Sequence, residues 1–184
     1  MSNISDAFGE FQFNFSDVKK NPSEIASWLH KFKKALDKGE YFTTLEYAAD
    51  EDFHKQDISN VVINFVANGR NAYQNNLEWI TTNKENDAYK LLLEMDGLVL
   101  NIEYDDMEIG CGFIGDGNYK IEVYDNAIHA GGYFNSEELT EDAFYEHEFG
   151  ETHDDWLDAV GADEEDDAIN EAYNDGSIAP QVER

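Results

Sequence analysis

The 184-residue chain has 41 acidic and 12 basic side chains, which gives a formal net charge of −29 at pH 7. Apolar residues make up 41% and aromatic residues 14%, too much for a disordered chain and enough for the core of one ordinary domain. Because phosphate groups and anionic lipids are themselves negative, this charge disfavours direct binding to nucleic acid or to a membrane.

The first part of the chain predicts a strand and a helix, followed by shorter elements. Phe11, Phe13 and Phe15 alternate with polar residues, which indicates a half-buried strand. Asn21, followed by a proline, has the residue type of a helix N-cap, and apolar residues then recur at helical spacing until Gly39. Two further strands and a short helix are expected at residues 41–47, 61–66 and 73–80.

The clearest local pattern is a predicted hairpin of residues 88–95 and 98–104. Asp96 and Gly97 lie between these segments, and a two-residue Asp-Gly turn suits the type I′ geometry of hairpins. A further strand is expected at 119–124, with a turn at 125–126 leading to 128–134. Consecutive strands joined by tight turns predict an antiparallel sheet of hairpins or a meander, and with one packed amphipathic helix the fold class is α+β.

The pattern changes after Phe134 to short acidic helices. They are predicted to begin at Asn135, Thr152 and Asp163, each with a narrow apolar stripe that would fix it to the body. The predicted organisation is an α+β body, an acidic helical segment packed on it, and a frayed tail, at residues 1–134, 135–174 and 175–184.

The negative charge is concentrated in the second half. Residues 1–100 have 16 acids and 10 bases, whereas residues 101–184 have 25 acids and 2 bases. Carboxylates three or four positions apart on a helix lie about 5–6 Å apart. This is comparable to the spacing of neighbouring phosphates on a nucleic-acid strand, which advances about 3.4 Å along the axis per nucleotide. Such rows can imitate a duplex backbone for a groove lined by Arg and Lys. The predicted partner-binding acids are Asp105, Asp106, Glu108, Glu137, Glu138, Glu141, Asp142, Glu146, Glu148, Glu151, Asp154, Asp155, Asp158, Asp163, Glu164, Asp166 and Asp167.

Motifs for catalysis or metal binding are weak. The segment from His147 to His153 departs from the His-Glu-x-x-His zinc pattern, because Glu151 occupies its fifth position. Cys111 lies between two glycines, which is typical of a small packed residue. We therefore predict no catalytic residue, no metal and no cofactor. An enzyme that uses Cys111 or a histidine is the alternative from a different class.

The cellular location is predicted from the cysteine content and the apolar segments. Cys111 is the only cysteine, so no internal disulfide can form, as is usual in a reducing compartment. The N-terminal residues lack the pattern of a signal peptide, and no apolar run approaches the roughly 20 residues of a membrane helix. We expect the cytoplasm of a bacterial host cell.

In small size, extreme acidity, short acidic helices and lack of a catalytic motif, the chain resembles the DNA-mimic inhibitors that phages and plasmids encode against restriction and CRISPR enzymes. The resemblance implies an inhibitor that binds the basic nucleic-acid-binding surface of a defence nuclease or its complex. A homodimer would lengthen the charged surface. Two alternatives are an immunity protein that neutralises a basic toxin nuclease, and an allosteric inhibitor that binds its partner through the sheet.

Overall fold

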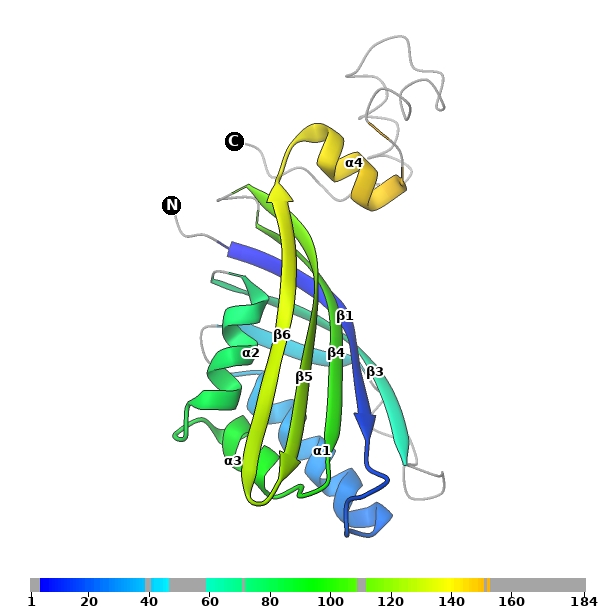
Figure 1. Ribbon diagram of the computed structural model, residues 1–184, viewed down its shortest axis with the longest axis vertical. Coiled ribbons are helices and arrows are strands. Elements are labelled where there is room, and N and C mark those ends of the chain that lie inside the picture. Colours follow the sequence, from blue (N-terminus) through cyan, green and yellow to red (C-terminus); the bar gives the residue numbers. More distant parts are fainter. Residues whose placement is uncertain are drawn as a thin grey trace. The chain divides into compact units, whose positions relative to one another are not determined.

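The computed structural model describes residues 4–38, 41–46, 59–70, 72–108, 112–150 and 152 (Figure 1). The chain divides into two compact units, Met1–Glu138 and Leu139–Arg184. The first unit contains a six-stranded antiparallel sheet in the order β2-β3-β1-β4-β5-β6. Its strands are β1 (Ile4–Asn14), β2 (Tyr41–Glu46), β3 (Asn60–Arg70), β4 (Val99–Glu108), β5 (Phe113–Tyr124) and β6 (Ala127–Glu138). The predicted α+β class is confirmed.

The helices α1 (Pro22–Leu36), α2 (Tyr73–Thr82) and α3 (Asp87–Leu93) cover one face of this sheet (Figure 1). The predicted start of α1 is confirmed, because Asn21 and Glu24 form a capping box. In the described part of the first unit, therefore, three helices pack on the sheet. The short helix expected at residues 73–80 is confirmed as α2, whereas α3 was not expected as a helix, and both bury apolar side chains.

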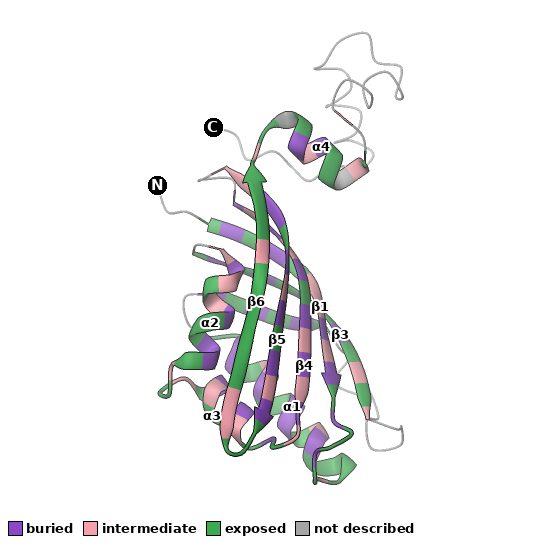
Figure 2. Cartoon of the chain, viewed as in Figure 1, coloured by how far each residue is buried: buried purple, intermediate pink, exposed green. Residues whose placement is uncertain are grey.

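The two faces of the sheet differ in burial, as the alternating colours of the strands in Figure 2 show. On β1, Phe11 and Phe13 point to the helices and are buried, whereas Phe8 points to the opposite face and is 46% exposed. Phe13 packs edge-on against Trp28 and Phe32 of α1. The predicted strand around these phenylalanines is confirmed, and the face opposite the helices is open.

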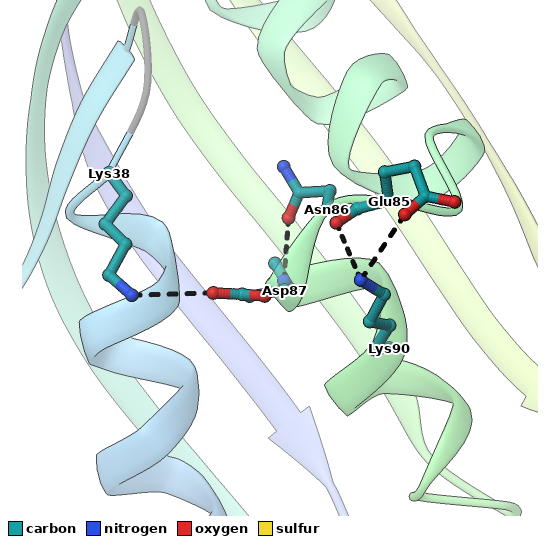
Figure 3. Close-up of polar contacts among 6 residues, drawn as sticks. Lys38, Glu85, Asn86, Asp87 and Lys90 are labelled. Carbon is teal, nitrogen blue, oxygen red and sulfur yellow. Dashed lines mark hydrogen bonds and ion pairs between the residues drawn. The ribbon is translucent and has the colours of Figure 1, made fainter.

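The predicted hairpin of residues 88–95 and 98–104 is wrong, because α3 occupies most of its first segment. Asn86 caps this helix by accepting a hydrogen bond from the Ala88 backbone N–H at 2.7 Å (Figure 3). Ala88 and Leu92 lie one turn apart and are both buried, so the apolar run fits helical rather than strand periodicity. Gly97, with φ 94°, lies in the turn that leads to β4.

Replacing Asn86 by alanine tests the helical state of residues 87–93. Loss of the cap should lower the free energy of unfolding by about 1 kcal/mol, measured by urea denaturation. Replacement of the nearby exposed Lys84 by alanine is the control and should change it by less than about 0.5 kcal/mol. Equal effects of the two substitutions would contradict the capping role.

The first predicted acidic helix begins later than expected. Residues 135–138 belong to β6 and pair with β5, with Asn135 opposite Asp116. The helix α4 (Glu141–Phe149) follows Thr140, whose hydroxyl accepts a hydrogen bond from the Ala143 backbone N–H at 3.1 Å. Strand pairing thus outweighs the helix-start pattern at Asn135. The two later predicted helices and the predicted tail lie outside the described residues.

Candidate protein-binding surface

Four carboxylates gather on the open face of the sheet. The register places Glu10 of β1 directly opposite Glu103 of β4, and Asp105 of β4 directly opposite Asp116 of β5. We call these four residues the acidic sheet surface. Neighbouring strands lie about 4.8 Å apart, and alternate residues of one strand about 7 Å apart, so the carboxylates form a closely spaced, two-dimensional array.

A shallow hollow of about 470 Å³ lies within this surface. Its lining consists of Gly9, Glu10, Glu103, Tyr104, Asp105, Asp116, Gly117, Asn118 and Tyr133. Two glycines flank Tyr104 across the sheet, and neither tolerates a side chain: a Cβ on Gly9 would lie 2.0 Å from the Glu103 carbonyl oxygen, and one on Gly117 2.3 Å from Tyr104 Cζ. The backbone of β1 at Gly9 therefore lies close to that of β4, and the Tyr104 ring covers Gly117.

The array of acids has an energetic cost to the fold. Like charges directly opposite each other on paired strands destabilise a sheet by roughly 0.2–1 kcal/mol per pair. Within the described residues, neither Glu103 nor Asp116 forms an ion pair with a Lys or Arg side chain. The nearest basic residue along β5, Lys120, instead pairs with Glu122 at 2.8 Å. Within the described residues, therefore, no lysine or arginine side chain offsets the charge of Glu103 or Asp116.

Apolar side chains border the acids on the same face. Phe8 lies beside Asp105 in the register and opposite Val66, and both apolar side chains are exposed. Phe42 of β2 extends this apolar border, and Tyr133 of β6, 55% exposed, lines the hollow from the other side. Aromatic anchors beside charged groups are common at protein–protein interfaces. The open face thus combines charge with contact area.

Of the predicted partner-binding acids, Asp105 lies on this surface, but Asp106 and Glu108 do not. Asp106 is 1% exposed and Glu108 is 2% exposed, because both point to the helix-covered face. The prediction that these two residues contact a partner is therefore wrong. Strand alternation separates them from Asp105, although the three are close in sequence.

Asp106 anchors the start of α2. The residue at the N-cap of α2, Ala72, has no side chain to cap the helix, and the Asp106 carboxylate accepts a 2.6 Å hydrogen bond from the Tyr73 backbone N–H in its place. The Ser5 hydroxyl donates to the second oxygen of Asp106. Burial raises the pKa of Asp106 to about 6, although both hydrogen bonds act to lower it. The geometry assigns Asp106 a structural role.

The tyrosines around Asp106 remain neutral hydroxyl donors and acceptors. Burial is the largest cause that raises the pKa of Tyr41 and of Tyr73. The Tyr41 hydroxyl lies 2.5 Å from Ser5 Oγ, and Tyr73 Oη lies 3.2 Å from Thr43 Oγ1. These contacts join β1, β2 and α2 in one polar network beneath the sheet.

The other predicted acids are distributed over β6, α4 and the remainder of the chain. Glu137 and Glu138 are exposed at the end of β6, and Asp142 and Glu146 are exposed on α4. Glu141 and Glu148 belong to α4, but their side chains lie outside what the structure describes, as does Cys111. The residues Glu151, Asp154, Asp155, Asp158, Asp163, Glu164, Asp166 and Asp167 also lie outside it. Among described residues, no group of three His, Cys, Asp or Glu side chains is placed to hold a metal ion.

Glu10, Glu103 and Asp116 are acids of this surface that no sequence motif predicts as site residues. Each lies at a strand position that alternates with buried positions. Because successive side chains of a strand point to opposite faces, this alternation places its side chain on the open face. The alternation does not predict that the three acids lie close together, because β1, β4 and β5 become neighbours only through the strand order of the sheet.

The first unit is an antiparallel α+β fold with helices on one face and a carboxylate array on the other. Comparisons with models of protein families, with curated proteins and with solved structures found no match to this chain. In the described ranges, none of the helices has the length and apolar character needed to cross a membrane.

Proposed function

We propose that the protein binds, through the acidic sheet surface, the positively charged nucleic-acid-binding surface of another protein and blocks it. The proposed target is a bacterial defence nuclease, either a CRISPR-Cas or a restriction complex, and the proposed site of action is the host cytoplasm. The observation that carries the proposal is the placement of Glu10 opposite Glu103 and of Asp105 opposite Asp116. A fold that keeps such like-charge pairs loses stability, and a cationic partner would relieve the repulsion.

The proposed mechanism is competition for a basic groove. The Cβ atoms that bear these carboxylates are about 5–8 Å apart in a sheet of this register, a spacing similar to that of neighbouring phosphates. Arg side chains that fork around phosphate oxygens can bind carboxylates in the same bidentate way. The target would therefore accept the protein in place of nucleic acid, and no covalent chemistry is required of the inhibitor.

The second unit adds to the same electrostatic field. Residues 139–184 have 16 acids and one base, more than half of the formal net charge of −29. A charge of this size draws a cationic partner from a distance and speeds association, most strongly at low salt. In this proposal, the sheet provides a fixed contact surface and the remaining acids accelerate the encounter.

A competition assay tests the proposal. Restriction and CRISPR effector complexes, each bound to a fluorescent DNA duplex, are titrated with the protein, and fluorescence anisotropy is recorded at about 50 and 200 mM salt. Release of the duplex is expected for the target complex, and higher salt should weaken the inhibitor, because the contacts are ionic. If duplex binding by every complex survives saturating protein at low salt, competition for these enzymes is wrong.

A further inference from the structure

Strand β6 forms an open edge of the described sheet. Nine of its twelve residues are exposed, and the other three are half-buried. Asp125 and Asn126 both have positive φ, so they form a type I′ turn that pairs Tyr124 with Ala127. In this geometry the even-numbered residues of β6 direct their backbone N–H and C=O groups away from β5. As far as the structure describes the chain, these backbone groups have no partner strand and can pair with another one.

This edge lacks three features that often prevent strand addition, although α2 and α3 contact β6. Edge strands are commonly protected by lysines, prolines or bulges. Residues 126–136 contain no charged residue and no proline, and residues 127–138 pair with β5 without an inserted residue. The opposite edge, β2, is only six residues long and ends in Glu46. In a chain this acidic, a long uncharged edge strand is unusual, and it is suited to pairing with another strand.

We propose that β6 pairs antiparallel with β6 of a second copy, about a two-fold axis at Gly132. In this register Gly132 meets itself, Ala130 meets Phe134, and Gly131 meets Tyr133. A side chain on Gly131 would have nothing within 4 Å, so the space above it is open. The exposed Tyr133 ring of the second copy fits there, in the way that cross-strand aromatics cover glycines.

The charge pattern of β6 favours a second copy in this orientation. The acids of β6 are Glu137 and Glu138, both at its C-terminal end. Antiparallel pairing about Gly132 places them opposite Ala127 and Asn126, which are uncharged. Parallel pairing would place acid beside acid, which is destabilising. The strand is thus complementary to itself.

The proposed dimer and the proposed inhibition respond oppositely to salt. Each copy has a formal charge of −29, so repulsion between copies weakens as the screening length falls from about 30 Å at 0.01 M to about 3 Å at 1 M. Self-association should therefore tighten with salt, whereas binding to a basic target should loosen. Either proposal can fail without the other.

The oligomeric state of the full chain tests the pairing. Light scattering after size-exclusion chromatography should give twice the 21.0 kDa chain mass at 1 M salt, with a larger monomer fraction at low salt. Ala130→Pro removes an edge-facing N–H from each copy and should weaken dimerisation about 100-fold, tenfold per lost hydrogen bond. Ala130→Thr keeps the N–H and should leave the dimer intact. A wild-type mass of one chain at all salt concentrations overturns the proposal.

A crosslink tests the register without depending on the stability of a variant. Gly131→Cys and Tyr133→Cys are made separately in a Cys111→Ser background. Directly opposite residues on paired strands have Cα atoms about 4.5–5.5 Å apart, within the range that a disulfide spans. Oxidation of the mixture should give a disulfide-linked dimer that neither variant gives alone. Equal crosslinking in the mixture and in the single variants excludes pairing about Gly132.

Discussion

Neutralising the acidic sheet surface is expected to weaken binding to the target nuclease about 100-fold or more at low salt. The variant combines Glu10→Gln, Glu103→Gln, Asp105→Asn and Asp116→Asn. Four exposed ion pairs contribute up to about 1 kcal/mol each, and 1.4 kcal/mol corresponds to a tenfold change in Kd. Isothermal titration against the complex found in the competition assay measures the loss.

A control with the same net charge separates the contact surface from the general field. It replaces four exposed acids on the helix-covered side, by Asp37→Asn, Glu78→Gln, Glu85→Gln and Glu94→Gln. Both variants change the formal charge from −29 to −25, so long-range attraction falls equally. The control should lose less than about tenfold in affinity. Equal losses would show that total charge, and not the sheet array, determines binding.

The same sheet variant should be at least as stable as the wild-type protein. Replacing Glu10 and Glu103, or Asp105 and Asp116, by amides removes repulsion between directly opposed strands. A higher midpoint in urea, together with weaker binding, would identify these acids as retained for function at the expense of stability. A lower midpoint would show that they stabilise the sheet, and the reasoning from like-charge pairs would be wrong.

Replacing Asp106 by asparagine is expected to change how stability depends on pH. Burial raises the pKa of Asp106 from 3.8 to about 6. The folded protein therefore holds this proton more tightly than the unfolded chain. The contribution of Asp106 to stability is fully present below about pH 4 and is lost as pH rises through about 6, with a total change of about 3 kcal/mol.

The Asp106→Asn variant should gain about 3 kcal/mol relative to wild type between pH 4 and pH 8. Its amide oxygen can accept from the Tyr73 N–H, and its amide nitrogen can donate to Ser5 Oγ, so the cap on α2 is kept. Urea denaturation at a series of pH values measures the difference, and Asp105→Asn controls for loss of one charge. Parallel stability curves for wild type and Asp106→Asn would contradict the assigned pKa.

Local sequence patterns correctly predicted the elements whose conformation is determined by residues close in sequence. The alternation around Phe13 and the capping residues of α1 act within a few residues, and both predictions were correct. Residues 88–95 were assigned wrongly because a short apolar run fits a strand or a helix, and the Asn86 cap decided in favour of the helix. Asn135 was misassigned because pairing with β5 determines its conformation.

By itself, the sequence determined the charge and the α+β class, because these follow from composition and from the spacing of apolar residues. Only the tertiary structure decided which acids lie together. The order of β1, β4 and β5 brings Glu10, Glu103, Asp105 and Asp116 into one array, and the alternation of side chains along β4 buries Asp106 beneath α2. The physical reason is that strand register joins residues about a hundred positions apart, which no local pattern encodes.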